Sequence, residues 1–354
     1  MNSAVFYPLL FIFLLSGAPA FAAEEADKAP KPAKLFSTTE TLAVTMTAPW
    51  QDIEKKDDFQ GAYPGTIEFT DDLGNRNRFE MTAERRGITR QKVCRYPPIK
   101  LRFTKETVKG TTFRGEKSLK MVTHCNKGSI FVQYYVLEML AYRMYNLITD
   151  FSFRVRPLSV TYIDSDSGKE NGPEFAFLIE DDSDLAKRND QVKLDIPKTI
   201  PRRLDPQEAS NLALFQFMIS NLDWAATSGP STKECCHNAK LIGHDPENDP
   251  VFAVPYDFDS AGIVDAKYAA PPQGLPVQRT TQRLYRGFCI HNPTIPAARQ
   301  RFLDQERAIY ALVENEDRLT GSSKKKTLKF LGRFFDILKD EKDFQDEIIE
   351  QCRK

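Results

Sequence analysis

Three short polar segments in the second half of this 354-residue chain carry carboxylate and amide side chains beside apolar residues. These segments are residues 221–224, 237–241 and 255–262. In chain order they supply one carboxylate, Asp223, one amide, Asn238, and a carboxylate pair, Asp257 and Asp259. A base, a metal-holding Asn and a metal-holding Asp follow one another in this order in kinase-type phosphotransferases. The order therefore indicates chemistry on the phosphates of ATP.

The carboxylate pair is the strongest of the three signals. Asp257 and Asp259 follow an expected strand at residues 251–254, and two-residue spacing in extended backbone points both side chains to one side. Two carboxylates so close together repel each other unless a cation joins them. We therefore expect both to face a metal ion. A solvated turn is the alternative interpretation.

The single carboxylate and the amide have less specific signals. Asp223 lies just beyond an apolar helix, where it is placed to accept or orient the proton of a hydroxyl substrate. Its alternative role is to cap the helix end or a turn. Asn238 follows fifteen residues later, before a short apolar strand at residues 239–242. Its amide oxygen suits Mg²⁺, which prefers hard oxygen ligands, whereas an Asn at this place is otherwise an ordinary turn residue.

The first half of the chain offers cations rather than a glycine-rich loop to hold phosphate. Neither GxGxxG nor GxxxxGK[ST] occurs. Residues 85–90 instead place several Arg side chains, Arg86 among them, around one glycine, a pattern that fits a phosphate grip or a surface turn. Lys100 and Lys120 stand on the polar faces of expected strands. We expect one of them to pair with Glu138, since a carboxylate on so apolar a helix needs a partner.

Apolar periodicity predicts the elements that position these residues. Strands are expected at residues 40–46, 66–70, 78–83, 98–103, 118–122, 155–163 and 174–180. Helices are expected at residues 131–148, from Asp205-Pro206 onward, at 297–313 and at 325–350. The first half is therefore mainly β and the second mainly helical, which predicts an α+β fold with two lobes sharing one cleft.

The N-terminus and the cysteines predict an exported protein. Residues 1–22 are uncharged, with an apolar run too short to span a bilayer, so we expect a cleaved signal peptide followed by a flexible linker at residues 23–39. A retained anchor is the alternative. Six cysteines suit an oxidising compartment. We expect Cys94 and Cys125 to cross-link a sheet, and Cys235 and Cys236 to bond to distant partners rather than to each other.

The charge balance limits the partners. Lys and Arg number 49, as do Asp and Glu, so the formal net charge is zero. No electrostatic argument then favours nucleic acid or an anionic membrane surface. We expect a periplasmic or secreted protein with no integral membrane span after signal cleavage.

Taken together, the motifs match a known family. The matching positions are Arg86, Gly87, Thr89 and Lys100, then residues 177–181, 221–224, 237–238 and 256–259. In this order the chain resembles the spore-coat protein H (CotH)-like atypical kinases and, more distantly, the HipA-like kinases. The resemblance spans about residues 40 to 320 and is dense only at the motifs. It implies a two-lobed protein-kinase-like fold, with a β-rich N-terminal lobe and a helical C-terminal lobe. It also implies ATP- and Mg²⁺- or Mn²⁺-dependent phosphorylation of Ser or Thr on an envelope or secreted protein.

The resemblance also assigns roles to residues and lobes. It implies a lobe at residues 40–181 and another at 182–354, with ATP between them and Glu180 in the joining segment beside the adenine. Asp223 is then the catalytic carboxylate, and Lys100 contacts the phosphates. The remaining roles are a metal site at Asn238, Asp257 and Asp259, and nucleotide contacts or their support from Arg86, Lys120 and Glu138.

Two other classes of protein fit the same residues. One is an inactive envelope scaffold or binding protein that keeps the kinase-like fold without transferring phosphate. The other is a metal-dependent hydrolase, which the shortage of histidines, four in all, makes the weakest of the three hypotheses.

Overall fold

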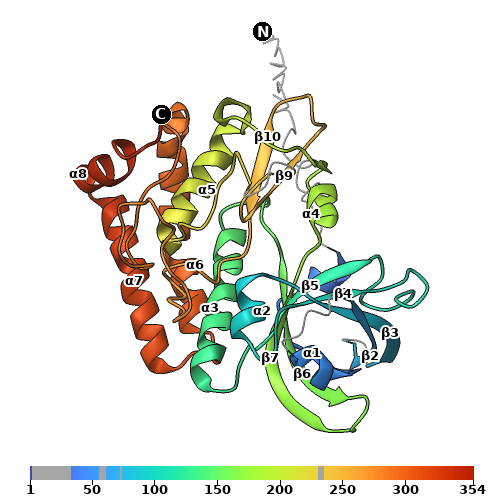
Figure 1. The fold of residues 1–354 in the computed structure, drawn as a ribbon. Coiled ribbons are helices and arrows are strands. Elements are labelled where there is room, and N and C mark those ends of the chain that lie inside the picture. The colour runs from blue at the N-terminus through green and yellow to red at the C-terminus, as the bar shows by residue number, and fades with distance from the viewer. Residues whose placement is uncertain (2–32, 56–60, 72–73, 230–234) are drawn as a thin grey trace. The chain divides into compact units, whose positions relative to one another are not determined.

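The computed structural model describes Met1 and residues 33–354, apart from residues 56–60, 72–73 and 230–234. Seven of the described strands close into a mixed β-barrel in the order β1-β2-β3-β4-β5-β7-β6 (Figure 1). The strands are β1 Leu42–Ala48, β2 Ala62–Thr70, β3 Arg76–Arg85, β4 Ile99–Arg102, β5 Ser118–Val122, β6 Val155–Asp164 and β7 Glu170–Ile179. Parallel pairing of β1 with β6 closes the barrel, and the other strand pairs are antiparallel.

Alternating apolar residues fill the barrel. In β1 every second residue is buried, as the sequence pattern predicts for one inward face. Phe113, from the loop between β4 and β5, contacts three inward-facing rings at centroid distances of 5.3 to 5.7 Å. Gly65 of β2 lies so close to β1 that an added Cβ would meet the Thr47 carbonyl oxygen at 2.4 Å. The narrow barrel therefore depends on a glycine at this position.

The expected two-lobed protein-kinase-like fold is wrong, although the α+β class is confirmed. The β-rich residues form a closed barrel instead of a lobe with an open sheet, because β6 returns to pair with β1 along its whole length, from Leu42↔Leu158 to Ala48↔Asp164. Residues Lys31–Lys354 form one compact unit. Alternation along a strand shows which side chains face inward, but it does not show which strands pair at the ends of a sheet.

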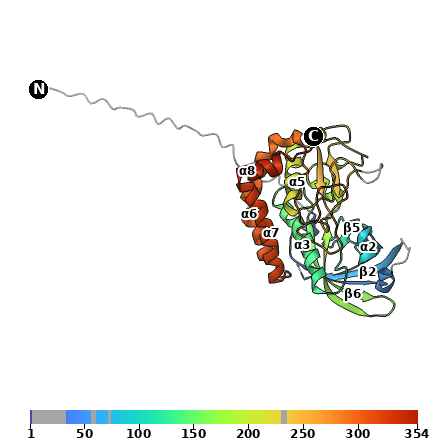
Figure 2. The ribbon, with the colours of Figure 1, turned by 60° about the vertical axis from the view of Figure 1, so that its left-hand side comes forward.

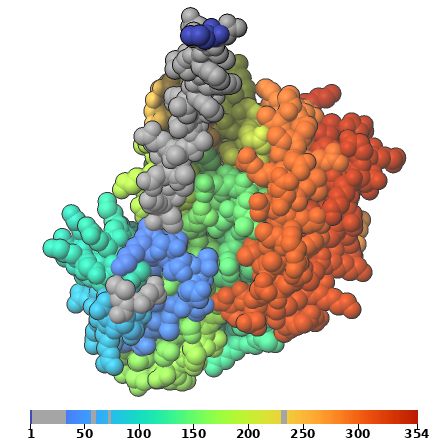
Figure 3. Space-filling view, turned by 180° about the vertical axis from the view of Figure 1, so that it is seen from behind, coloured from blue at the N-terminus to red at the C-terminus, as the bar shows by residue number. Residues whose placement is uncertain are grey.

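Long helices pack on one another beside the barrel. They are α3 Ser129–Asn146, α5 Pro206–Ile219, α6 Ile295–Glu314 and α7 Gly321–Lys339. Helix α3 is buried nearly all round, as its apolar pattern predicts, and one apolar core includes residues of all four helices. Helices α6 and α7 lie side by side (Figure 2), and from behind they form a continuous orange-to-red surface (Figure 3).

The ends of the helices follow their capping residues. Asp205 caps α5 by accepting a hydrogen bond of 2.8 Å from the Glu208 amide, and Pro206 occupies the first turn as expected. Ser220, with φ of 52°, ends that helix. The single helix expected at residues 325–350 is wrong, because α7 ends before the extended residue Asp340, whose side chain caps a new helix. The short helices are α1 Trp50–Glu54, α2 Thr89–Val93, α4 Asp182–Arg188, α8 Glu341–Phe344, the 3-10 helices Lys34–Phe36, Pro201–Arg203 and Cys289–Thr294, and the π-helix Gln345–Ile349.

A small sheet beside α5 carries the residues of interest. Its strands are β8 Val192–Lys193, β9 Ala239–Gly243 and β10 Val251–Pro255, in the order β10-β9-β8. Strands β9 and β10 form an antiparallel hairpin with Ala239 opposite Pro255. Asn238 and Tyr256 therefore stand just outside the open end of this hairpin.

Disulfides join all six cysteines. The expected cross-link between Cys94 and Cys125 is confirmed, and Cys289 bonds to Cys352 across a separation of 63 residues. The expectation for Cys235 and Cys236 is wrong, because the other four cysteines pair among themselves and these neighbours bond to each other. Three disulfides indicate an oxidising environment. The expected signal peptide and most of the linker lie outside the described residues. Within the described part, every helix is too short or too polar to span a membrane.

Glu116, just before β5, predicts a pH-dependent stability. Its side chain is 2% exposed, and its carboxylate oxygens have no hydrogen-bond partner among the described residues. Burial, with a contribution from nearby acidic residues, raises the pKa of Glu116 to about 8. The folded protein therefore binds this proton more tightly than the unfolded chain. The stability that the proton contributes is complete below about pH 4.5 and is lost as pH rises to about 8.

Replacing Glu116 by Gln should remove this pH dependence. Between pH 5 and pH 8, urea denaturation should show the wild type losing up to about 4 kcal/mol more unfolding free energy than Glu116→Gln. The exposed Glu106→Gln is the matched control and should follow the wild type. Parallel pH profiles for wild type and Glu116→Gln would contradict the buried, proton-binding state of Glu116.

Candidate functional site

The open end of the β9–β10 hairpin brings two of the predicted site residues together. The Tyr256 amide donates to the Asn238 carbonyl oxygen at 3.1 Å, so Asn238 and Asp257 flank the hairpin end. Both have left-handed backbone, with φ of 50° and 63°. This conformation is uncommon outside glycine, and where it persists the surrounding structure enforces it, often at functional sites. The extended backbone expected at Asp257 is therefore wrong.

Asp223 joins this group from the loop after α5. Its Oδ1 lies 2.6 Å from His237 Nε2. Asn238 Nδ2 donates to the Asp223 carbonyl oxygen at 2.7 Å and to Asp223 Oδ2 at 3.2 Å. The hydrogen bond that His237 makes to the Asp223 carboxylate is the main cause that raises the pKa of His237 above its ordinary value, although partial burial opposes it. Asp223, His237 and Asn238, which lie within fifteen positions of one another in sequence, thus form one hydrogen-bonded unit.

The orientation of the Asn238 amide follows from its partners. Both Asp223 atoms that it contacts are acceptors, so the nitrogen of the amide faces them and the oxygen faces away. Within the described residues, Asn238 Oδ1 has no hydrogen-bond partner. The two oxygens of Asp257 also differ. Oδ1 accepts a hydrogen bond from Arg90 at 2.9 Å, while Oδ2 has no hydrogen-bond partner among the described residues. Two oxygens are thus available to a ligand, one from each residue.

Arg90 is the cation that joins the carboxylates predicted to need one. Its guanidinium, 6% exposed, contacts Asp257 at 2.9 Å and Asp259 at 3.2 Å. Its other edge makes a two-pronged contact of 3.0 and 3.3 Å with Glu138. The expected pairing of Glu138 with Lys100 or Lys120 is therefore wrong. Helix α2 carries Arg90 inward, whereas the two lysines lie on barrel strands that direct them elsewhere.

This buried cluster holds more negative than positive charge. Burial lowers the pKa of Arg90, but the surrounding carboxylates outweigh burial and hold that pKa well above its ordinary value. Burial raises the pKa of Glu138 to about 8, although Arg90 opposes the rise, and burial also raises the pKa of Asp259. Three carboxylates share one guanidinium, which favours the protonated form of the most buried ones. Tyr268 donates to Asp259 Oδ2 at 3.1 Å, the same oxygen that Arg90 contacts at 3.2 Å.

An arginine in the helical half fixes the loop that carries Asp223. Arg286 Nη1 donates to the carbonyl oxygens of Leu222 and Trp224, at 2.6 and 2.9 Å, one on each side of Asp223. The guanidinium also lies 5.4 Å from the Trp224 ring centroid. Trp224, 4% exposed, is therefore a buried support of the loop.

Basic side chains lie beside this group, around Tyr256. Lys120 Nζ contacts Asp182 at 2.7 Å, and Lys240 Nζ contacts the other oxygen of Asp182 at 3.8 Å. Both ammonium groups stand over the Tyr256 ring, 5.1 and 5.6 Å from its centroid. Burial lowers the pKa of Lys120, Asp182 opposes this, and the neighbouring charges of Arg86 and Lys240 lower it further. Arg86, Lys120 and Lys240 thus form a cluster of positive charge.

Lys100 and Glu180, the two predicted residues not yet placed, line a small cavity of about 160 Å³. Lys100 and Lys120 lie on one side of it and Glu180 on another. Glu180 is fully buried and receives hydrogen bonds from Arg188 at 2.8 Å and from the Arg154 amide at 3.0 Å. A structural role therefore accounts for Glu180, and its place beside an adenine stays a prediction.

The residues present suit a metal held jointly with phosphate better than a protein-only metal cage. Among the described residues, no group of three His, Cys, Asp or Glu side chains is arranged to hold a metal ion. Mg²⁺ bound with nucleotide needs only one or two carboxylates, because phosphate and water oxygens complete its shell. Asn238 and Asp257 supply such a partial set. Asp259 is occupied by Arg90 and Tyr268, and its role as a metal ligand stays a prediction.

The sequence predicted Asp223, Asn238 and Asp257, but it did not point to Arg90, His237 and Arg286, which hold them, or to Lys240, which lies beside them. His237 stood beside Asn238 in the same polar segment and was not assigned a role. Arg90 was one of several arginines in residues 85–90, with nothing to distinguish it. The partners of Lys240 and Arg286 are set only by tertiary packing. No protein-family model matches the chain, and no characterised protein matches it at a significant level.

Proposed function

We propose that this protein is an exported phosphotransferase that uses ATP with Mg²⁺ or Mn²⁺ to phosphorylate Ser or Thr hydroxyls on an envelope or secreted protein. The observation that carries the proposal is the convergence of Asp223, Asn238 and Asp257 at one hairpin end. Available carboxylate and amide oxygens lie there beside the cations Lys120 and Lys240. Hard oxygen ligands next to positive charge are the two requirements for holding a metal–nucleotide phosphate group.

Asp223 is placed to act on the hydroxyl of the substrate. Its side chain is 38% exposed, while His237 and Asn238 fix its orientation. In the proposed reaction the hydroxyl oxygen forms a bond to the γ-phosphorus, and the bond from that phosphorus to the ADP oxygen breaks. Asp223 receives the hydroxyl proton. Asn238 and Asp257 would hold the metal of bound ATP, which would supply positive charge beside the phosphates. Lys120 and Lys240 stabilise negative charge on the phosphates, and Arg286 holds the loop of Asp223 still.

The sequence resemblance supports this proposal independently of the fold. The last three motifs of the resemblance, residues 221–224, 237–238 and 256–259, contain the residues that the hairpin gathers, whereas the two-lobed fold that it implied is not present. The three disulfides indicate an oxidising environment. With the expected signal peptide at residues 1–22, this supports a periplasmic or secreted location.

Calorimetric titration with ATP tests the nucleotide site. ATP should bind in the presence of Mg²⁺ or Mn²⁺, and Asp257→Asn should weaken this binding by about tenfold or more, since an anionic metal ligand is lost. The exposed Asp166→Asn, on the β6–β7 turn, is the control and should bind as the wild type does. Absence of ATP binding with either metal would overturn the proposal.

An inactive scaffold is the second candidate, and one observation favours it. Arg90 already forms ion pairs with Asp257 and Asp259, so these carboxylates have a structural role without any metal. A scaffold of this kind predicts ATP binding that is weak or absent and no transfer of label. Transfer of phosphate by the wild type, lost in Asp223→Asn, excludes it.

A further inference from the structure

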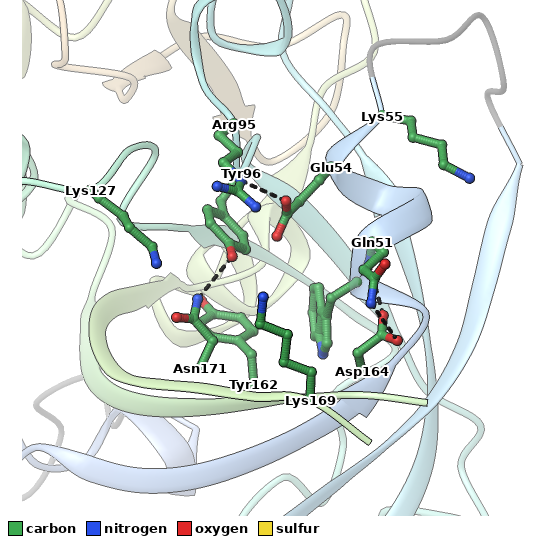
Figure 4. Close-up of a pocket in the computed structure, with 11 residues that line it drawn as sticks. Gln51, Glu54, Lys55, Arg95, Tyr96, Lys127, Tyr162, Asp164, Lys169 and Asn171 are labelled. Carbon is green, nitrogen blue, oxygen red and sulfur yellow. Dashed lines mark hydrogen bonds and ion pairs between the residues drawn. The ribbon is translucent and has the colours of Figure 1, made fainter. Parts of the chain in front are cut away.

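A second polar cavity lies on the barrel and shares no lining residue with the site at Asp223. It has a volume of about 280 Å³. Its walls come from α1, from the segment after α2 and from the β6–β7 hairpin (Figure 4). The volume equals that of about nine liquid water molecules, which suits a ligand of monosaccharide size.

Aromatic rings form the floor of this cavity. Trp50 meets Tyr162 edge to face at 4.8 Å, and Tyr96 lies 5.9 Å from Tyr162. Tyr162 is 1% exposed, and its hydroxyl has no hydrogen-bond partner in the described part of the chain. A buried hydroxyl without a partner costs free energy, so its presence in the wall of a cavity points to a ligand that completes it. Asn171 donates to the Tyr96 hydroxyl at 2.8 Å and keeps that ring in place.

The rim of the cavity has an excess of positive charge. Four basic residues and two carboxylates line it. Both carboxylates are engaged, Glu54 with Arg95 at 2.6 Å and Asp164 with the Gln51 amide at 2.9 Å. Lys127 and Lys169, by contrast, have no hydrogen-bond or ion-pair partner for their ammonium groups among the residues described. Figure 4 shows both ammonium groups directed toward the side where Tyr96 and Asn171 lie.

We propose that this cavity binds a compact organic oxyanion, a monosaccharide-sized body that carries one phosphate or carboxylate group. The oxyanion lies between Lys127 and Lys169, which supply charge-assisted hydrogen bonds. The body of the ligand fills the rest of the cavity, and the Tyr162 hydroxyl in its wall gains its missing partner. This site is independent of the proposed phosphotransferase function, because none of its residues belongs to that machinery.

Titration of the whole protein with three matched sugars tests the proposal. The probes are glucose 6-phosphate, glucuronate and uncharged glucose, which separate a phosphate from a carboxylate ligand and either from a neutral sugar. At least one anionic probe should bind, with glucose much weaker, and added salt should weaken the binding. The double variant Lys127→Gln/Lys169→Gln should weaken it by about tenfold or more. Tyr162→Phe, which removes only the hydroxyl, should weaken it about fivefold.

A double variant at two other exposed lysines serves as the control. Lys105→Gln/Lys109→Gln removes two exposed lysines from another loop and should leave the binding unchanged. Because Lys127 and Lys169 are also exposed, their double variant should keep the wild-type circular dichroism spectrum. Failure of both anionic probes to bind at concentrations up to about 10 mM would overturn the proposal. Equal affinity in the Lys127→Gln/Lys169→Gln variant would do the same.

Discussion

Asp223→Asn should reduce phosphoryl transfer by about 10²- to 10⁴-fold while leaving ATP binding nearly unchanged. A positioned general base contributes a factor of this size, and an amide cannot accept the hydroxyl proton. The substitution keeps the shape of the side chain, so the contacts of Asp223 with His237 and Asn238 can persist. The measurement is the initial rate of label transfer from γ-labelled ATP, with calorimetric ATP binding as the parallel readout.

A second substitution distinguishes how the transfer rate depends on the Asp223 carboxylate from how it depends on the loop that carries it. Arg286→Met removes the hydrogen bonds to the Leu222 and Trp224 carbonyl oxygens but leaves the Asp223 carboxylate intact. It should lower the rate less than Asp223→Asn does. If Asp223→Asn transfers phosphate at the wild-type rate, the assignment of Asp223 is wrong.

Arg90→Met should lower the free energy of unfolding by about 3 to 5 kcal/mol. Removing one partner from a buried ionic cluster leaves the others without compensation, and here three carboxylates lose the cation that they share. Methionine keeps much of the side-chain volume, so the loss of stability comes from the missing charge more than from a cavity. Urea denaturation followed by circular dichroism measures it. Arg86→Met is the matched control, since Arg86 has no ion pair in the described structure, and it should change stability by less than about 1 kcal/mol.

The double variant Arg90→Met/Glu138→Gln tests the pairing itself. Neutralising Glu138 removes the most deeply buried of the unpaired carboxylates, so the double variant should recover part of the lost stability. A double-mutant cycle should therefore show a coupling of more than about 1 kcal/mol between the two residues. Additive losses would mean that Arg90 and Glu138 do not depend on each other.

Local sequence patterns predicted most of the helices and strands, but they did not predict that seven strands close into a barrel. The alternation in β1 and the Asp205-Pro206 helix start appear in the structure as expected, because both depend on neighbours in sequence. The barrel depends on β1 pairing with β6, more than a hundred residues away, and periodicity carries no record of that register. The same limit applies to the disulfide between Cys235 and Cys236. The sequence does not show that the other four cysteines pair among themselves, which leaves these two neighbours to bond to each other.

The candidate site shows the same division. The sequence predicted Asp223, Asn238 and Asp257 as site residues because their types and order are unusual beside apolar strands, and the structure brings the three together. The need of Asp257 and Asp259 for a cation was also anticipated, and Arg90 meets it within the protein. Its identity was not predictable, since Arg90 and Asp257 are 167 residues apart and only packing brings them together.

Incubation of the purified protein with γ-labelled and α-labelled ATP, each with Mg²⁺ or Mn²⁺ and an extract of envelope proteins, tests the central claim most directly. The account predicts that label from the γ-position alone is transferred to Ser or Thr and that Asp223→Asn abolishes this transfer. Label transferred from the α-position would show nucleotidyl transfer instead. No transfer from either position, by a folded protein, would contradict the proposed phosphotransferase function.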